Sequence, residues 1–148
     1  MVVKADRQSG KTQLLCTLAA KLAVQHYKVC IVFSCKHQAL SGMQRVAQLL
    51  PDAESIDNRV RPLEGGGWVH CGKKVVDDAD IFMVDEIGYM DPTVFYEDLA
   101  PKLLWENPVL LIGTPTGDAH NLMARLCRLK DKKEGTHVFN VIDVTTVN

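Results

Sequence analysis

The 148-residue chain lacks several features that would place it in a specialised class of protein. It has no apolar run of 18 residues and no charged-then-apolar leader with a cleavage site, so we expect a soluble, intracellular protein without a membrane partner. Its net charge of −1 supplies no overall field that would attract nucleic acid. Internal repeats and low-complexity segments are absent too. The remaining composition, 47% hydrophobic and 24% charged, predicts one domain over residues 1–148 with a single core.

Cysteine patterns typical of disulfide or zinc frameworks are also missing. None of the five cysteines belongs to a Cys-x-x-Cys pair. Cys16 and Cys30 lie in apolar stretches, where a free thiol behaves as a small hydrophobic group. Two histidines lie near other cysteines, but their spacing matches no standard zinc finger. We therefore expect reduced thiols in the core.

The most informative segment present is the loop at residues 5–12, between a short apolar run and a helix-periodic stretch. A triphosphate needs inward-pointing backbone N–H groups, a lysine for the β/γ oxygens, a hydroxyl for Mg²⁺ and a helix N-terminus. Gly10, Lys11 and Thr12 supply the last three. The usual leading glycine is replaced by Ala5, and Arg7 compensates for it. The predicted nucleotide-binding residues of this loop are Arg7, Gln8, Ser9, Gly10, Lys11 and Thr12.

Two acids follow a second informative segment, the apolar run at 81–84. Buried parallel strands are continuous apolar runs, and ligands bind at their carboxyl ends. Asp85 can therefore hold Mg²⁺ together with Thr12, while Glu86 can polarise the attacking water. The two motifs, in this order, predict binding of ATP and Mg²⁺. The alternative is that the acids form a structural cap on the next segment.

Apolar periodicity predicts alternating strands and helices. Strands are expected at 29–33, 68–71, 81–85, 109–112 and 138–144. Helices are expected at 14–23, before Pro51, from 93 onward with a kink or restart at Pro101, and at 122–129. Residues 52–67 are turn-rich and predict a surface excursion. The alternation favours an α/β, three-layer P-loop NTPase fold, with a mostly parallel sheet covered by helices on both faces. Polar strand ends at 5–12, 85–86 and 113–116 then share one edge, the predicted active site.

These motifs resemble those of the large terminase subunit, the viral DNA-packaging ATPase of tailed bacteriophages and herpesviruses. Arg7, in place of the leading glycine, resembles that family's deviant phosphate loop. Val84-Asp85-Glu86, followed about 25 residues later by Gly113-Thr114-Pro115-Thr116-Gly117, resembles its acidic strand and coupling motif. The segment 81–143 is closest to the herpesvirus type.

The resemblance covers nearly the whole chain but departs from the family in extent. Few residues precede the loop, where the family has an adenine-contacting region, and no C-terminal nuclease follows. We therefore expect a fragment, one exon's product or a minimal ATPase domain.

The resemblance implies an ATP-hydrolysing motor that drives double-stranded DNA into a capsid. Arg7 would stabilise the γ-phosphate in cis, with a contribution of roughly 10³–10⁵ in rate; pairing with Asp6 or Glu86 is the alternative for Arg7. Thr114 would contact the nucleotide and, with Thr116, report its state to the DNA-gripping parts. The implied catalytic residues are Glu86, Arg7 and Lys11, and the implied metal ligands are Thr12 and Asp85.

The implied partners are double-stranded DNA, a portal or capsid, a small terminase subunit and further copies of the chain. The implied location is the host nucleus for a herpesvirus type and the host cytoplasm for a bacteriophage. Two other functions stay open: a helicase-like nucleic-acid translocase, and a small P-loop kinase or nucleotide-binding module. A helicase needs a second lobe that 148 residues cannot hold, and a kinase needs a base pocket and an arginine-rich lid.

Overall fold

The computed structural model describes residues 2–4, 10–50, 52–104, 107–113 and 141–143. The strands are β1 (Val2–Lys4), β2 (Lys28–Val32), β3 (Glu54–Ile56), β4 (Arg59–Arg61), β5 (Trp68–Gly72), β6 (Ile81–Val84), β7 (Val109–Gly113) and β8 (Val141–Asp143). The helices are α1 (Lys11–Val24), α2 (Lys36–Leu49), η1 (Ile87–Tyr89), α3 (Pro92–Val94), η2 (Phe95–Leu99) and α4 (Ala100–Leu104). The helix expected at 122–129 lies outside the described residues. None of the helices described here is long and apolar enough to cross a membrane.

The described strands form one sheet in the order β3-β4-β5-β2-β6-β7-β1-β8. Every pairing from β5 to β8 is parallel. Val84 pairs with both Val32 and Leu111, and Lys4 pairs with Gly113, so the carboxyl ends of β2, β6, β7 and β1 share one edge. This confirms that the strand ends after residues 4, 84 and 113 meet there. The strand β7 lies between β1 and β6.

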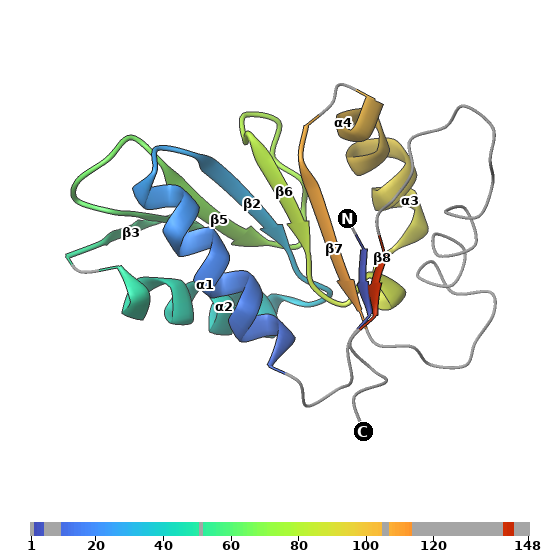
Figure 1. Ribbon diagram of the computed structural model, residues 1–148, viewed down its shortest axis with the longest axis horizontal. Helices are drawn as coiled ribbons and strands as arrows, with labels where there is room; N and C mark the ends of the chain where they lie inside the picture. Colours follow the sequence, from blue (N-terminus) through green and yellow to red (C-terminus); the bar gives the residue numbers. More distant parts are fainter. Residues whose placement is uncertain (1, 5–9, 51, 105–106, 114–140, 144–148) are drawn as a thin grey trace.

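Helices cover both faces of the sheet (Figure 1). Because successive strand residues point to opposite faces, Val29 and Ile31 of β2 pack with α1 and α2. Cys30 and Val32 belong to the opposite core, which the segment from η1 to η2 covers. The two helices α1 and α2 lie side by side on the first face (Figure 1). The predicted three-layer α/β fold is confirmed.

The helix α2 approaches the sheet closely at Gly42. A Cβ atom added there would overlap the ring of Phe33, which is buried just beyond the end of β2. Only a residue without a side chain permits this spacing. The close packing holds the first half of α2 beside the carboxyl edge of the sheet.

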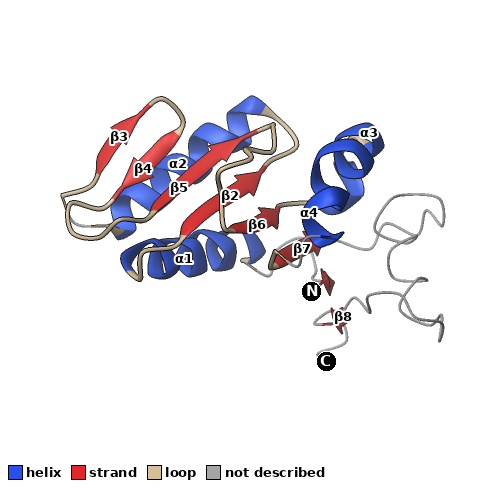
Figure 2. Cartoon of the chain, turned by 90° about the horizontal axis from the view of Figure 1, so that it is seen from above, coloured by secondary structure: helices blue, strands red, loops and turns tan. Residues whose placement is uncertain are grey.

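The surface excursion predicted for residues 52–67 is wrong in part. Residues of β3 and β4 form an antiparallel hairpin that extends the sheet beyond β5 (Figure 2). Val60 is fully buried and pairs with Val69, which anchors the hairpin. Every residue of β3 is exposed, and this strand lacks the apolar alternation that predicts a half-buried strand. The signal available in the sequence was the turn-forming pair Asp57-Asn58, and in the structure Asp57 has a φ of 56°.

The helix expected from residue 93 is interrupted as the position of Pro101 predicts. It begins with α3, where the side chain of Asp91 accepts a hydrogen bond from the Thr93 backbone N–H. The wider π-helical turn η2 then directly precedes α4. Pro101 has no N–H to donate to the carbonyl of Glu97 four residues earlier, so regular α-helical bonding cannot continue there.

The cysteine prediction holds for three of the four cysteines that the structure describes. Cys16, Cys30 and Cys71 are buried, and burial raises the pKa of the Cys16 and Cys30 thiols to about 11. Cys35 is exposed at the start of α2, so the expectation of a core position is wrong for this residue.

Candidate nucleotide-binding and catalytic site

The helix α1 begins at the carboxyl edge of the sheet with an open N-terminus. Gly10 precedes its first turn with φ 74° and ψ 24°, a left-handed conformation that favours glycine. A Cβ at Gly10 would meet no atom of a described residue within 4 Å, and the left-handed backbone conformation is what favours glycine here. The first turn contains no acidic residue. Its backbone N–H groups and the positive end of the helix dipole therefore suit an anion.

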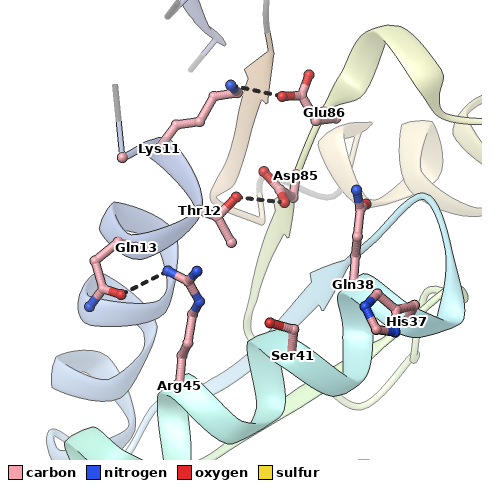
Figure 3. Close-up of a pocket in the computed structure, with 10 residues that line it drawn as sticks. Lys11, Thr12, Gln13, His37, Gln38, Ser41, Arg45, Asp85 and Glu86 are labelled. Carbon is pink, nitrogen blue, oxygen red and sulfur yellow. Dashed lines mark hydrogen bonds and ion pairs between the residues drawn. The ribbon is translucent and has the colours of Figure 1, made fainter. Parts of the chain in front are cut away.

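Lys11 is buried at this N-terminus and forms an ion pair. Its side chain is 5% exposed, and its Nζ lies 2.9 Å from Oε1 of Glu86, which is 17% exposed (Figure 3). Charged groups this buried are rare in proteins unless they are paired. A phosphate that binds here therefore meets a lysine whose charge Glu86 already balances.

Thr12 and Asp85 form the second contact of the site. The Thr12 hydroxyl donates to Oδ2 of Asp85 at 3.0 Å (Figure 3), although the two residues are 73 positions apart. Asp85 is 3% exposed, and its other oxygen, Oδ1, accepts no hydrogen bond from any described residue. Burial raises the pKa of Asp85, the Thr12 hydrogen bond opposes this shift, and the neighbouring Glu86 reinforces it. The carboxylate is thus costly to ionise without a cation beside it.

Glu86 adopts a left-handed conformation that is uncommon for residues other than glycine, with φ 58° and ψ 62°. It follows Asp85 at the end of β6 and precedes the short helix η1. Adjacent residues of a continuing strand would point to opposite faces. Both acids line the same pocket here, because the chain turns sharply at Glu86.

The helix α2 forms the wall opposite α1. The pocket between them has a volume of about 350 Å³ (Figure 3). Arg45 donates a hydrogen bond from Nη1 to Oε1 of Gln13 at 3.0 Å. The α2 residues that line the pocket are His37, Gln38, Ser41 and Arg45. These residues carry no motif and were not among the predicted site residues. Their helical spacing, after a strand that ends at the same edge, was the signal that could have found them.

The donor set fits a magnesium ion. Mg²⁺ is usually held by one or two carboxylates together with phosphate oxygens and water. The Thr12 hydroxyl and the Asp85 carboxylate meet at 3.0 Å, and the second oxygen of Asp85 is buried without a described partner. Over the described residues no group of three or more His, Cys, Asp and Glu side chains is placed to hold a metal ion. Phosphate oxygens and water are the ligands that would complete such a site.

The predicted site residues that lie within the described part of the chain come together in one pocket. Lys11, Thr12, Asp85 and Glu86 line one pocket with Gly10. The other predicted site residues, Arg7, Gln8, Ser9 and Thr114, and the suggested relay residue Thr116 lie outside the described residues.

The mostly parallel sheet between two layers of helices, with Gly10 directly before α1, is a three-layer α/β fold of the P-loop NTPase type. The chain is similar to the Thermus phage P74-26 large terminase ATPase domain, at 17% identity and a TM-score of 0.69 over 96% of this chain and 73% of that one. It is also similar to an arginine-to-alanine variant of that domain, at 16% identity and a TM-score of 0.66 over 97% of this chain and 74% of the variant. Its similarity to the HK97 bacteriophage large terminase has 16% identity and a TM-score of 0.69. That match covers 98% of this chain and 35% of the HK97 chain.

No protein-family model and no curated protein sequence matches the chain. At 16–17% identity, the likeness to the solved structures concerns the fold. The fold is that of phage large terminase ATPase domains.

Proposed function

We propose that the chain is an ATP-hydrolysing motor domain of the large terminase type, which drives double-stranded DNA into a viral capsid. The observation that carries this proposal is the convergence of Lys11 and Thr12 with Glu86 and Asp85, at 2.9 Å and 3.0 Å. This set combines a phosphate cation, a metal-binding hydroxyl and two acids at a helix N-terminus. The fold shared with phage terminase ATPase domains supports a motor ATPase among the P-loop enzymes.

The residues divide the chemistry among them. The triphosphate lies at the N-terminus of α1, where backbone N–H groups and Lys11 contact its β- and γ-phosphate oxygens. Thr12 and Asp85 would hold a Mg²⁺, which would supply positive charge to neutralise these phosphates. Glu86 accepts a proton from the water that attacks the γ-phosphorus. The bond to the β–γ bridging oxygen breaks as the new P–O bond forms, and ADP and phosphate leave.

Phosphate binding changes the surroundings of Lys11. In the structure the ammonium lies 2.9 Å from Oε1 of Glu86, and phosphate oxygens compete for the same ammonium. Phosphate binding therefore weakens the pairing between Lys11 and Glu86. The weaker pairing leaves the Glu86 carboxylate better placed to accept a proton from the attacking water.

The wider assembly is proposed from the same resemblance. The partners are duplex DNA, a portal or capsid, a small terminase subunit and further copies of the chain. Arg7 would stabilise the γ-phosphate, and Thr114 would sense the nucleotide and, with Thr116, signal its state toward the DNA.

ATP hydrolysis tests the site directly. We expect Mg-dependent phosphate release by the chain, loss of nucleotide binding in Lys11→Ala, and a turnover lower by roughly 10²–10⁴ in Glu86→Gln. Lys21→Ala and Glu97→Gln are matched controls, because both residues are exposed and lie outside the pocket. Equal hydrolysis by the chain and both site variants would rule out the assignment. Stimulation by duplex DNA, without strand separation or phosphotransfer to a small acceptor, distinguishes a packaging motor from a helicase and a kinase.

A further inference from the structure

A second hollow lies on the other side of α2 from the nucleotide pocket. It has a volume of about 460 Å³ and lies between the start of α2 and the carboxyl end of β5. The α2 residues that line this second hollow are Lys36, Ala39 and Leu40. They lie about half a turn around the helix from the α2 residues that line the nucleotide pocket. The first half of α2 is therefore a wall shared by the two hollows.

The second hollow carries concentrated positive charge. Lys36, Lys73 and Lys74 line it, and none of the described residues that line it is acidic. The positive charge comes from the lysines, because burial lowers the pKa of the neighbouring His70 and the nearby Arg59 lowers it further. The start of α2 adds the positive end of a helix dipole. This contrasts with a chain whose net charge is −1.

The nearby acids are engaged elsewhere. In the loop that follows these lysines, Asp77 pairs with Lys102 at 3.0 Å, and Asp78 pairs with Arg59 at 3.0 Å. Within the described part of the chain, no ion pair involves Lys36, Lys73 or Lys74. Three exposed lysines thus line one hollow, and none of them is paired with a carboxylate of a described residue.

The basic surface continues into an adjoining hollow. Lys73 and Lys74 also line a space of about 360 Å³, together with Ser34 and the exposed Tyr89. Among the described residues that line this space, one is acidic, Asp91. Two hollows that share a pair of lysines form a surface longer than a single small anion needs, and a row of phosphates would fit along it.

We propose that this surface, formed by Lys36, Lys73 and Lys74, contacts the phosphate backbone of duplex DNA. The proposal rests on the proposed function, and it names residues through which the motor meets its DNA. Lysine contacts to phosphates release counterions and give sequence-independent binding. Because α2 lines both hollows, DNA and nucleotide would act on the two sides of one helix.

The test is DNA binding by the full chain without nucleotide, so that its outcome does not depend on hydrolysis. A labelled duplex is titrated with the parent chain and with the triple variant Lys36→Ala, Lys73→Ala and Lys74→Ala, by fluorescence anisotropy at several salt concentrations. Each phosphate contact contributes about eightfold at 0.1 M salt, so the triple variant should bind roughly 500-fold more weakly. The slope of log affinity against log salt should become less steep by roughly 2.7.

A second triple variant keeps the charge change and moves its position. Lys21→Ala, Lys28→Ala and Arg61→Ala remove three exposed cations that line neither hollow. This control should bind DNA within about threefold of the parent, as the loss of distant exposed charges is largely screened. Circular dichroism and thermal unfolding verify that both variants fold. Equal losses in the two triple variants, or no DNA binding by the parent, would overturn the proposal, whereas absent ATP hydrolysis would overturn only the proposed function.

Discussion

The ion pair between Lys11 and Glu86 makes Glu86 a competitor of the phosphates. Its two side chains are 5% and 17% exposed, so solvent screens the 2.9 Å contact far less than a surface pair. We expect Glu86→Gln to have two opposite effects. Nucleotide should bind more tightly, because the phosphates no longer displace a carboxylate, while turnover should fall because the base is lost.

The size of the binding effect follows from the contact. Lys11 stays charged in this variant, so glutamine still accepts a charge-assisted hydrogen bond and only the charge–charge attraction is lost. This loss is about 1 kcal/mol, which is roughly fivefold in affinity. ADP should gain this factor, since its β-phosphate needs Lys11. ATP should gain somewhat more, because repulsion between Glu86 and the γ-phosphate is also removed.

Isothermal titration calorimetry with Mg-ADP and Mg-ATP measures both affinities, and phosphate release measures turnover. Glu97→Gln, an exposed acid outside the pocket, controls for the loss of one charge. Unchanged or weaker ADP binding in Glu86→Gln would refute the competition argument. Parental turnover in that variant would refute the role of Glu86 as the base.

Further predictions concern the core of the site and α2. Asp85→Asn should weaken Mg²⁺ dependence yet raise the melting temperature of the nucleotide-free chain by roughly 2–4 °C, on the order of 1 kcal/mol, since it removes a buried carboxylate that is only partly hydrogen-bonded. The folded-state pKa of Asp85 is raised, so the ionised carboxylate destabilises the fold at pH values above that pKa. The gain in stability of Asp85→Asn should therefore shrink as the pH falls through the folded-state pKa of Asp85. Asp98→Asn, at an exposed position, should change neither Mg²⁺ dependence nor melting temperature. Gly42→Ala should lower the free energy of unfolding by about 1–3 kcal/mol in urea titrations, because its methyl group meets the Phe33 ring; parental stability would contradict that packing. Arg45→Ala should weaken Mg-ATP binding by no more than about 1 kcal/mol in calorimetry, since this exposed pocket cation is partly screened; an increase in affinity would exclude a contact with phosphate.

The sequence by itself determined the local elements and the chemistry that they carry. Gly10-Lys11-Thr12 needs only a helix start to present an N–H cluster, an ammonium and a hydroxyl, and the apolar run before Asp85 needs only burial to become a strand. These signals depend on neighbours a few residues apart. The alternation of strands and helices then restricts the fold to a parallel sheet between helices, which the structure confirms.

The tertiary structure alone decided which of these pieces meet. The position of β7 between β1 and β6, the β3–β4 hairpin and the α2 wall of the pocket result from packing across the sheet, where distant residues compete for the same partners. The clearest case is Lys11, which a motif assigns to phosphate but which lies against Glu86 in the folded chain. A sequence motif specifies what a side chain can bind. The partner that it binds without nucleotide depends on the left-handed turn at Glu86, which places a partly buried carboxylate in the same pocket.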